Sequence, residues 1–138
     1  MTGYSGTPLA SKLGIKPGHR VLFDHAPDDF DALVAPLPGG VEVLRRAVAP
    51  LDLVVTFATS ANRLERRVAQ LEPRLAADGC IWTAWPKRSS GVATDITEDV
   101  LRERFLPPGR LVDVKVCAID ETWSGLKFVI RTEQRFRR

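Results

Sequence analysis

The segment at residues 53–59, LVVTFAT, constrains the fold more than any other part of the sequence. It is apolar at nearly every position, so a strand here buries both of its faces, as strands do in parallel sheets covered by helices. Apolar residues then recur at spacings of four, three and four, which predicts a helix over residues 61–77 that ends at Gly79. The four apolar positions of that helix are Leu64, Val68, Leu71 and Leu75.

Further strands and helices alternate along the chain, which predicts an α/β fold: a three-layer, Rossmann-like sandwich around a mostly parallel six-stranded sheet. We expect the sheet order 2-1-3-4-6-5, numbered along the chain, with only the last strand antiparallel. The order follows from the central place of residues 53–59 and from a final hairpin whose second strand inserts beside residues 80–85. The expected strands cover residues 21–26, 41–46, 53–59, 80–85, 111–119 and 126–131.

Local patterns predict where several of these elements begin, end and face. Thr7 is placed to cap a first helix that Gly14 ends in a left-handed conformation. Asp95 and Glu98 have the spacing of a capping box and predict a helix that Pro107 breaks. Three alternating residues of the hairpin are expected to share one face of the sheet. They are Val112, Val114 and Val116.

Length and charge favour one domain with a neutral surface. The chain has 138 residues, 44% of them hydrophobic and 27% charged, which is typical of one globular domain. We place that domain at residues 1–131 and expect a disordered basic tail at 132–138. Residues 131–138 hold four Arg and one Glu, a charge of +3, and the whole chain is also +3. The remainder is therefore neutral, which disfavours nucleic-acid binding by a basic surface.

The two cysteines and the apolar segments bear on the compartment. Cys80 and Cys117 are too few for a disulfide framework in a chain of this length, and no apolar run approaches the roughly 18–20 residues of a membrane helix. The sequence has no secretory signal pattern at its start. We therefore expect a reduced, cytoplasmic protein that does not associate with membranes.

Three segments resemble the strand regions of class I S-adenosylmethionine-dependent methyltransferases: KPGHRVL at residues 16–22, DLVV at 52–55 and DGCIW at 78–82. The likeness spans residues 14–131 and implies the sheet order given above. The whole chain, from MTGYSGTPLA at residues 1–10 to TWSGLK at 122–127, also resembles a family of small actinobacterial proteins to which no function is assigned.

The sequence departs from the methyltransferase pattern where the cofactor binds. The resemblance implies a glycine-rich loop after the first strand, because only glycine allows the backbone to approach the cofactor closely, but DHAPD at residues 24–28 contains no glycine. It also implies an acid after the second strand, where Arg45 and Arg46 stand, and residues 48–52 are too short for the usual third strand and helix. We therefore expect a truncated, degenerate relative with no cofactor and no methyltransferase activity.

The loop after residue 85 is the candidate ligand site, because ligands of open parallel sheets bind at the carboxyl ends of the strands. It offers two cations, three hydroxyls and a glycine beside a helix N-terminus, which suits an anion. The turn of the final hairpin should face it and add a stacking wall, so that Lys87 and Trp123 share one pocket. Alternatively, the loop caps its own helix and the tryptophan anchors the hairpin. The candidates are Lys87, Arg88, Ser89, Ser90, Gly91, Thr94, Trp123 and Ser124.

His25, beside Asp24, is a secondary candidate. Its acidic neighbours lack the spacing of a metal site and are equally explained as charges at a helix N-terminus, so no metal is expected. The leading hypothesis is a non-catalytic module that binds a small anionic ligand or a protein partner at the carboxyl edge of the sheet. The alternatives are a small enzyme of unassigned class at the same edge, with Lys87 for an anionic group and His25 as base, and, more weakly, nucleic-acid association. That last interaction would use the tail and the helix arginines Arg63, Arg66, Arg67 and Arg74.

Overall fold

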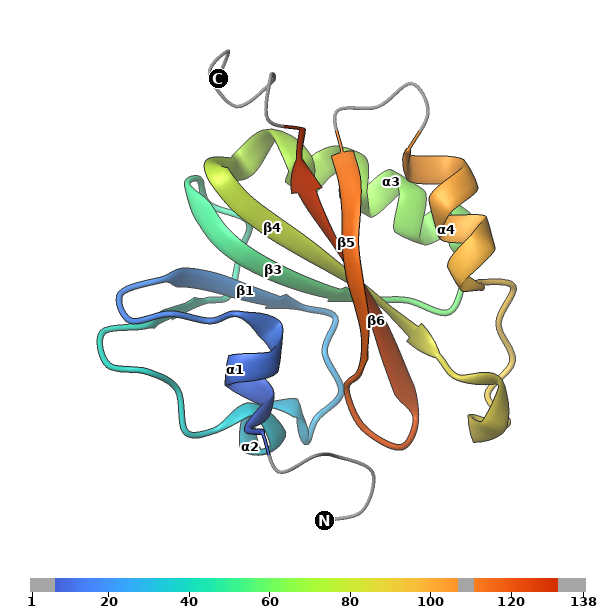
Figure 1. Cartoon of the computed structure of the whole chain (residues 1–138), viewed down its shortest axis with the longest axis horizontal. Coiled ribbons are helices and arrows are strands. Elements are labelled where there is room, and N and C mark those ends of the chain that lie inside the picture. The colour runs from blue at the N-terminus through green and yellow to red at the C-terminus, as the bar shows by residue number, and fades with distance from the viewer. Residues whose placement is uncertain (1–6, 107–110, 132–138) are drawn as a thin grey trace.

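The computed structural model describes residues 7–106 and 111–131, which form a six-stranded sheet with helices on both faces (Figure 1). The sheet order is β2-β1-β3-β4-β6-β5. Among the described strands, only β6 runs in the direction opposite to the others. The predicted order and direction are confirmed. The strands are β1 (Arg20–Asp24), β2 (Glu42–Leu44), β3 (Leu51–Phe57), β4 (Leu75–Pro86), β5 (Leu111–Ala118) and β6 (Trp123–Ile130).

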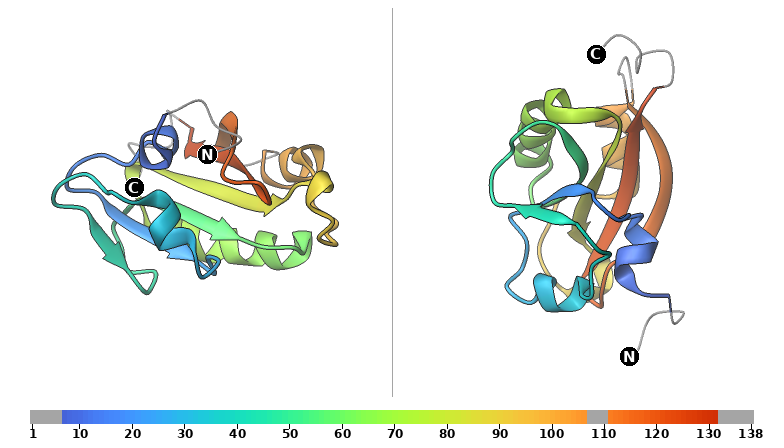
Figure 2. Two further views of the ribbon diagram at one scale, coloured as in Figure 1. Left: turned by 90° about the horizontal axis from the view of Figure 1, so that it is seen from below. Right: turned by 90° about the vertical axis from the view of Figure 1, so that its left-hand side faces the viewer.

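The sheet separates two apolar cores, so the molecule has three layers (Figure 2). Helices α1 (Leu9–Leu13) and α2 (Phe30–Val34) cover one face, and α3 (Ala61–Leu71) and α4 (Glu98–Phe105) cover the other. Strand β3 is buried on both sides because its side chains alternate between these cores. Val54 packs on the α3 side, whereas Leu53 and Val55 pack on the α1 side.

Helix α3 is shorter than its apolar periodicity predicts. It ends at Leu71, a short 3-10 turn follows at Glu72–Arg74, and β4 already begins at Leu75. Leu75 still packs in the core beside α3, so its burial continues the helical pattern although its backbone is extended. Gly79 does not end a helix but lies within β4, where a Cβ atom would stand 2.7 Å from the carbonyl oxygen of Leu51.

Strand β5 contains a bulge that overturns the predicted common face of its valines. The register with β6 shifts around Val114, so one extra residue stands in β5. Val112 lies opposite Val129, on the α1 side of the sheet, whereas Val116 lies opposite Leu126, on the α3 side. Val112 and Val116 therefore point to opposite faces, because the extra residue reverses the alternation of side chains.

The helix ends also differ in detail from the predicted caps. Helix α4 is capped by Thr97, not by a box of Asp95 and Glu98. Asp95 caps the neighbouring helix instead: its Oδ1 accepts a hydrogen bond of 2.8 Å from the backbone N–H of Ala61, at the start of α3. Pro8, one residue after the predicted Thr7, stands at the cap of α1, and the predicted Gly14 does end this helix in a left-handed conformation, at φ 88°.

Two predicted features fall outside the described residues: the helix break at Pro107 and the basic tail at residues 132–138. No described helix combines the length and the apolar character that crossing a bilayer requires.

Candidate functional site

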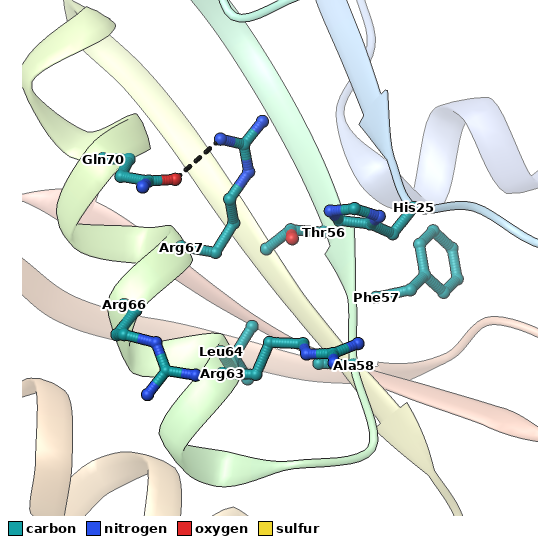
Figure 3. Close-up of a pocket in the computed structure, with 9 residues that line it drawn as sticks. All are labelled: His25, Thr56, Phe57, Ala58, Arg63, Leu64, Arg66, Arg67 and Gln70. Carbon is teal, nitrogen blue, oxygen red and sulfur yellow. Dashed lines mark hydrogen bonds between the residues drawn. The ribbon is translucent and has the colours of Figure 1, made fainter.

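The connections of the sheet change sides between β1 and β3. The helix after β1, α2, lies on one face, and the helix after β3, α3, lies on the other. In open α/β sheets, ligands bind at such a switch point, beside the carboxyl ends of the strands. A cleft of about 300 Å³ opens there, which we call the switch-point cleft (Figure 3). Its lining residues are His25, Thr56, Phe57, Ala58, Arg63, Leu64, Arg66, Arg67 and Gln70.

The cleft exists because the chain between β2 and β3 is short. Residues 45–50, all of which the structure describes, contain no helix. On the face that α3 occupies, this part of the chain contributes only the partly buried side chain of Ala47 to the core, next to Leu44 at the end of β2. The carboxyl end of β1 therefore lies open beside α3.

An ion pair between Asp24 and Arg67 joins the end of β1 to helix α3 beside the cleft. Asp24, at the end of β1, is 6% exposed and accepts hydrogen bonds from both Nε and Nη2 of Arg67, at 2.9 and 2.8 Å. The hydroxyl of Thr56, in the neighbouring strand, donates a third, of 2.7 Å. Burial alone would raise the pKa of the Asp24 carboxyl, but these hydrogen bonds outweigh it and hold that pKa below its usual range.

His25 follows this carboxylate at the rim of the cleft. Its φ of 56° lies in the left-handed region, which residues other than glycine seldom occupy. The imidazole is two-thirds exposed, with Nε2 3.9 Å from Oδ2 of Asp24. Figure 3 shows His25 entering the cleft from the β1 side and Arg63 from the α3 side.

Two arginines of α3 bring unpaired positive charge to the cleft. Arg63 and Arg66 are three residues apart, so they lie on one face of the helix, and neither forms an ion pair with any residue in the described part of the chain. Arg67, by contrast, uses Nε and Nη2 on Asp24 and Nη1 on Gln70. The cleft therefore presents two free guanidinium groups and one imidazole above a floor of apolar side chains.

The loop after β4, which the sequence nominates, lines a different groove. This groove, about 370 Å³ in volume, lies between the end of β4 and the start of α4, and we call it the β4–α4 groove. Three of the predicted residues, Arg88, Gly91 and Thr94, line it. Lys87, Ser89, Ser90, Trp123 and Ser124 are not among its lining residues.

Two of the three hydroxyls of that loop, on Ser90 and Thr94, bond to the loop itself and to its neighbours. Ser90 Oγ donates to the carbonyl of Lys87, at 2.7 Å, and accepts from the backbone N–H of Val92. Thr94 Oγ1 donates to the carbonyl of Thr59, at 2.6 Å, and accepts from the N–H of Ile96. This is the arrangement of a loop that caps its own structure.

The hairpin turn does meet the loop, but Trp123 does not face it. The backbone N–H of Lys87 donates to the carbonyl of Thr122, at 2.7 Å. The ring of Trp123 packs edge-to-face on Phe57, with centroids 5.1 Å apart, and Phe57 packs in the same way on Phe30. Trp123 thus anchors the hairpin to the α2 side of the core, and neither it nor Lys87 lines the β4–α4 groove.

From the sequence, the arginines of α3 are assigned only to the weakest alternative, nucleic-acid association, and not to a small-ligand site. A signal was nevertheless present: a helix that directly follows a central strand borders the switch point, and this one carries Arg63, Arg66 and Arg67 within five positions. The partnership of Arg67 with Asp24 had no signal, because 43 residues separate the two.

Comparison with known proteins shows the fold class. No protein-family model matches the sequence, and comparison with curated proteins gives no significant match. Solved structures do resemble it. The fibrillarin pre-rRNA processing protein of Methanococcus jannaschii aligns with a TM-score of 0.62 and 14% identity, over 94% of this chain and 71% of that one.

Two further structures agree. A fibrillarin of Aeropyrum pernix, solved with natively bound S-adenosyl-L-methionine, gives a TM-score of 0.58 and 17% identity, over 88% of this chain and 73% of that one. An rRNA methylase of Streptococcus thermophilus gives 0.55 and 8%, over 94% and 99%. At these identities the likeness is one of fold: the chain has the Rossmann-like fold of class I S-adenosylmethionine-dependent methyltransferases. The expected resemblance to an actinobacterial family stays a prediction.

The residues of this chain do not fit S-adenosylmethionine in the mode that the fold implies. The loop after β1 has no glycine, and Asp24, the last residue of β1, directs its side chain to Arg67. Beside the end of β2, a groove of about 270 Å³ is lined by Asp28 and Asp31 together with Arg45, where an acid for ribose hydroxyls is expected. At these two positions the chain therefore lacks the glycine loop and the ribose-binding acid of that binding mode.

The described residues give little support for a metal site or for a nucleophilic cysteine. Among them, no three His, Cys, Asp or Glu side chains gather closely enough to hold a metal ion. Burial raises the pKa of the Cys80 thiol to about 11 and also raises that of Cys117, so neither cysteine is activated as a nucleophile.

Proposed function

We propose that this protein is a non-catalytic, methyltransferase-like module that binds a small anionic ligand at the carboxyl edge of its sheet, in the switch-point cleft. One observation carries the proposal: Arg63 and Arg66 stand unpaired at the place where ligands of this fold class bind. Two uncompensated guanidinium groups on one side of a cleft attract anions and form strong, charge-assisted hydrogen bonds with them.

The non-catalytic part of the proposal rests on Asp24. This carboxylate is a candidate general base beside His25, but two hydrogen bonds from Arg67 and one from Thr56 engage it. Its lowered pKa also disfavours proton uptake near neutral pH. The surroundings of Asp24 therefore favour a structural role.

Thermal-shift and calorimetric titration with a panel of anions tests the proposal. The panel contains inorganic phosphate, sugar phosphates, nucleotides and coenzyme A, with S-adenosylmethionine included because no binding in its usual mode is expected. A ligand that binds the folded state raises the melting temperature. Arg63→Gln/Arg66→Gln should weaken binding by roughly a hundredfold, the effect of losing two charge-assisted hydrogen bonds of about 1.5 kcal/mol each.

Two matched variants make the result specific. Arg45→Gln/Arg46→Gln removes the same charge away from the switch-point cleft and should leave binding unchanged. Arg88→Gln removes a cation from the β4–α4 groove and should also have no effect. Loss of binding in Arg88→Gln alone would place the ligand in that groove, and the absence of binding by every anion would refute the proposal.

A further inference from the structure

We propose that the ligand of the switch-point cleft is a small phosphate monoester, held by Arg63 and Arg66 together with His25. This inference rests on the proposed function and names the chemical class of its ligand. It depends on which donors of the cleft are free, on what the floor of the cleft lacks, and on the size of the space.

The free donors outnumber what a carboxylate can use. One guanidinium satisfies both oxygens of a carboxylate in a bidentate pair. The cleft is lined by two guanidinium groups, on Arg63 and Arg66, and by the imidazole of His25 (Figure 3). A phosphate monoester has three terminal oxygens and carries close to two negative charges at pH 7, so it can use more of these donors than a carboxylate can.

The floor of the cleft gives no polar recognition of its own. Phe57, Ala58 and Leu64 are buried apolar residues. The hydroxyl of Thr56 is the polar group of the floor, and it already donates to Asp24. Affinity must therefore come from the charged rim, which favours a ligand with a dense, multiply charged head group over an uncharged polar molecule.

The space and the charge also limit the rest of the ligand. A volume of about 300 Å³ lies at the lower end of the range for small-molecule sites, roughly 300–1,000 Å³. A phosphate on a sugar-sized group fits this space better than a dinucleotide or coenzyme A. S-adenosylmethionine, whose sulfonium is cationic, would meet repulsion from Arg63 and Arg66.

Glucose 6-phosphate and glucuronate form a matched pair of probes, because they carry a phosphate and a carboxylate at the same end of a hexose. Calorimetric titration at pH 8 should show glucose 6-phosphate binding at least tenfold more tightly than glucuronate, with inorganic phosphate as the head-group reference. Arg63→Gln and Arg66→Gln should each weaken phosphate binding about tenfold, and Arg45→Gln should not. His25→Gln should weaken it less, because an imidazole offers fewer N–H donors than a guanidinium group does.

The outcomes separate this inference from the proposed function. Equal affinity for the two probes, lost in both arginine variants, would overturn the phosphate class and leave anion binding intact. Tighter binding of a single-stranded oligonucleotide with a steep salt dependence, lost in the same variants, would replace the small ligand by nucleic acid. If no anion of the panel binds the folded protein, the proposed function fails together with this inference. Circular dichroism melting of each variant confirms that it folds, as expected for exposed side chains.

Discussion

Replacing Arg67 by leucine tests whether the buried ion pair organises the carboxyl end of the sheet. Arg67→Leu keeps the aliphatic part of the side chain against the helix and removes the guanidinium that holds Asp24. The carboxylate then keeps one of its three hydrogen bonds, from Thr56, in a site where it is 6% exposed. A buried charge without its partner is strongly destabilising.

The geometry sets the size of the effect. Two hydrogen bonds to a charged group, each worth about 1.5–3 kcal/mol, are lost. The Arg67 side chain is 28% exposed, so solvent already weakens the pair and the lower end of this range applies. We expect the free energy of unfolding at pH 7 to fall by about 3 kcal/mol. For a chain of this length, that corresponds to a melting temperature lower by roughly 10 °C.

The loss of stability in Arg67→Leu should depend on pH. In the wild-type protein the lowered pKa of Asp24 contributes stability above the unfolded pKa of about 3.9, and this contribution is lost as the pH falls through the folded value. In Arg67→Leu, burial dominates and the pKa of Asp24 rises. The variant therefore gains relative stability as the pH falls and the carboxyl takes up a proton. The stability gap should be largest at pH 7 and shrink toward pH 4, as measured by urea denaturation followed by tryptophan fluorescence.

A double-mutant cycle supplies the control. In the background of Asp24→Asn, position 24 carries no charge that could lose its partner. In that background, Arg67→Leu should lower the free energy of unfolding much less, which gives a coupling energy of about 2 kcal/mol between the two side chains. A stability gap that stays constant between pH 4 and 7, or a coupling energy near zero, would refute the role assigned to the pair.

Three further predictions concern the packing and the helix cap elsewhere in the fold. Gly79→Ala should lower the free energy of unfolding by about 2 kcal/mol in urea denaturation, because the added Cβ stands 2.7 Å from a backbone oxygen of β3. Gly39→Ala, which meets nothing within 4 Å, is its control, and equal losses would argue against the close contact. Thr97→Ala should lower the free energy of unfolding by about 1 kcal/mol, because the hydrogen bond that caps α4 is lost, and Thr97→Ser should keep that stability. If Thr97→Ala leaves the free energy of unfolding unchanged, the cap contributes nothing. Burial raises the pKa of Cys80 to about 11, so at pH 8 this cysteine should be alkylated only when the protein unfolds, whereas half-buried Cys117 should react earlier. Equal alkylation rates of the two cysteines, measured by mass spectrometry, would contradict this order.

Much of the fold follows from the spacing of apolar residues, and the errors have local causes. The run at residues 53–59 identified the central strand β3, and the final hairpin gave the position of β6. The pattern failed at Leu75, because a buried leucine continues a helical repeat equally well from a helix or from a strand that enters the same core. It failed again in β5, since a bulge leaves no trace in an alternating run of valines.

The candidate site was less accessible to sequence reasoning. The carboxyl edge of the sheet could be predicted from topology, and His25 lies there, in the lining of the switch-point cleft. The pairing of side chains decides which cations remain free, and that pairing depends on distances between residues far apart in the chain. Arg67 is neutralised by Asp24 while its neighbour Arg66 is not, although the sequence treats the two alike.

The insertion of β6 between β4 and β5 has a consequence for how the protein is made. On the ribosome, β4 emerges with β3 available on one side, but its other neighbour is encoded some forty residues later, at Trp123–Ile130. During that interval the nascent chain carries an unpaired, largely apolar strand edge, the kind of surface that attracts other chains. The second edge of β4 can therefore be paired only after β6 has been synthesised. Chaperones that shield hydrophobic edges would act on this chain between the synthesis of β4 and that of β6.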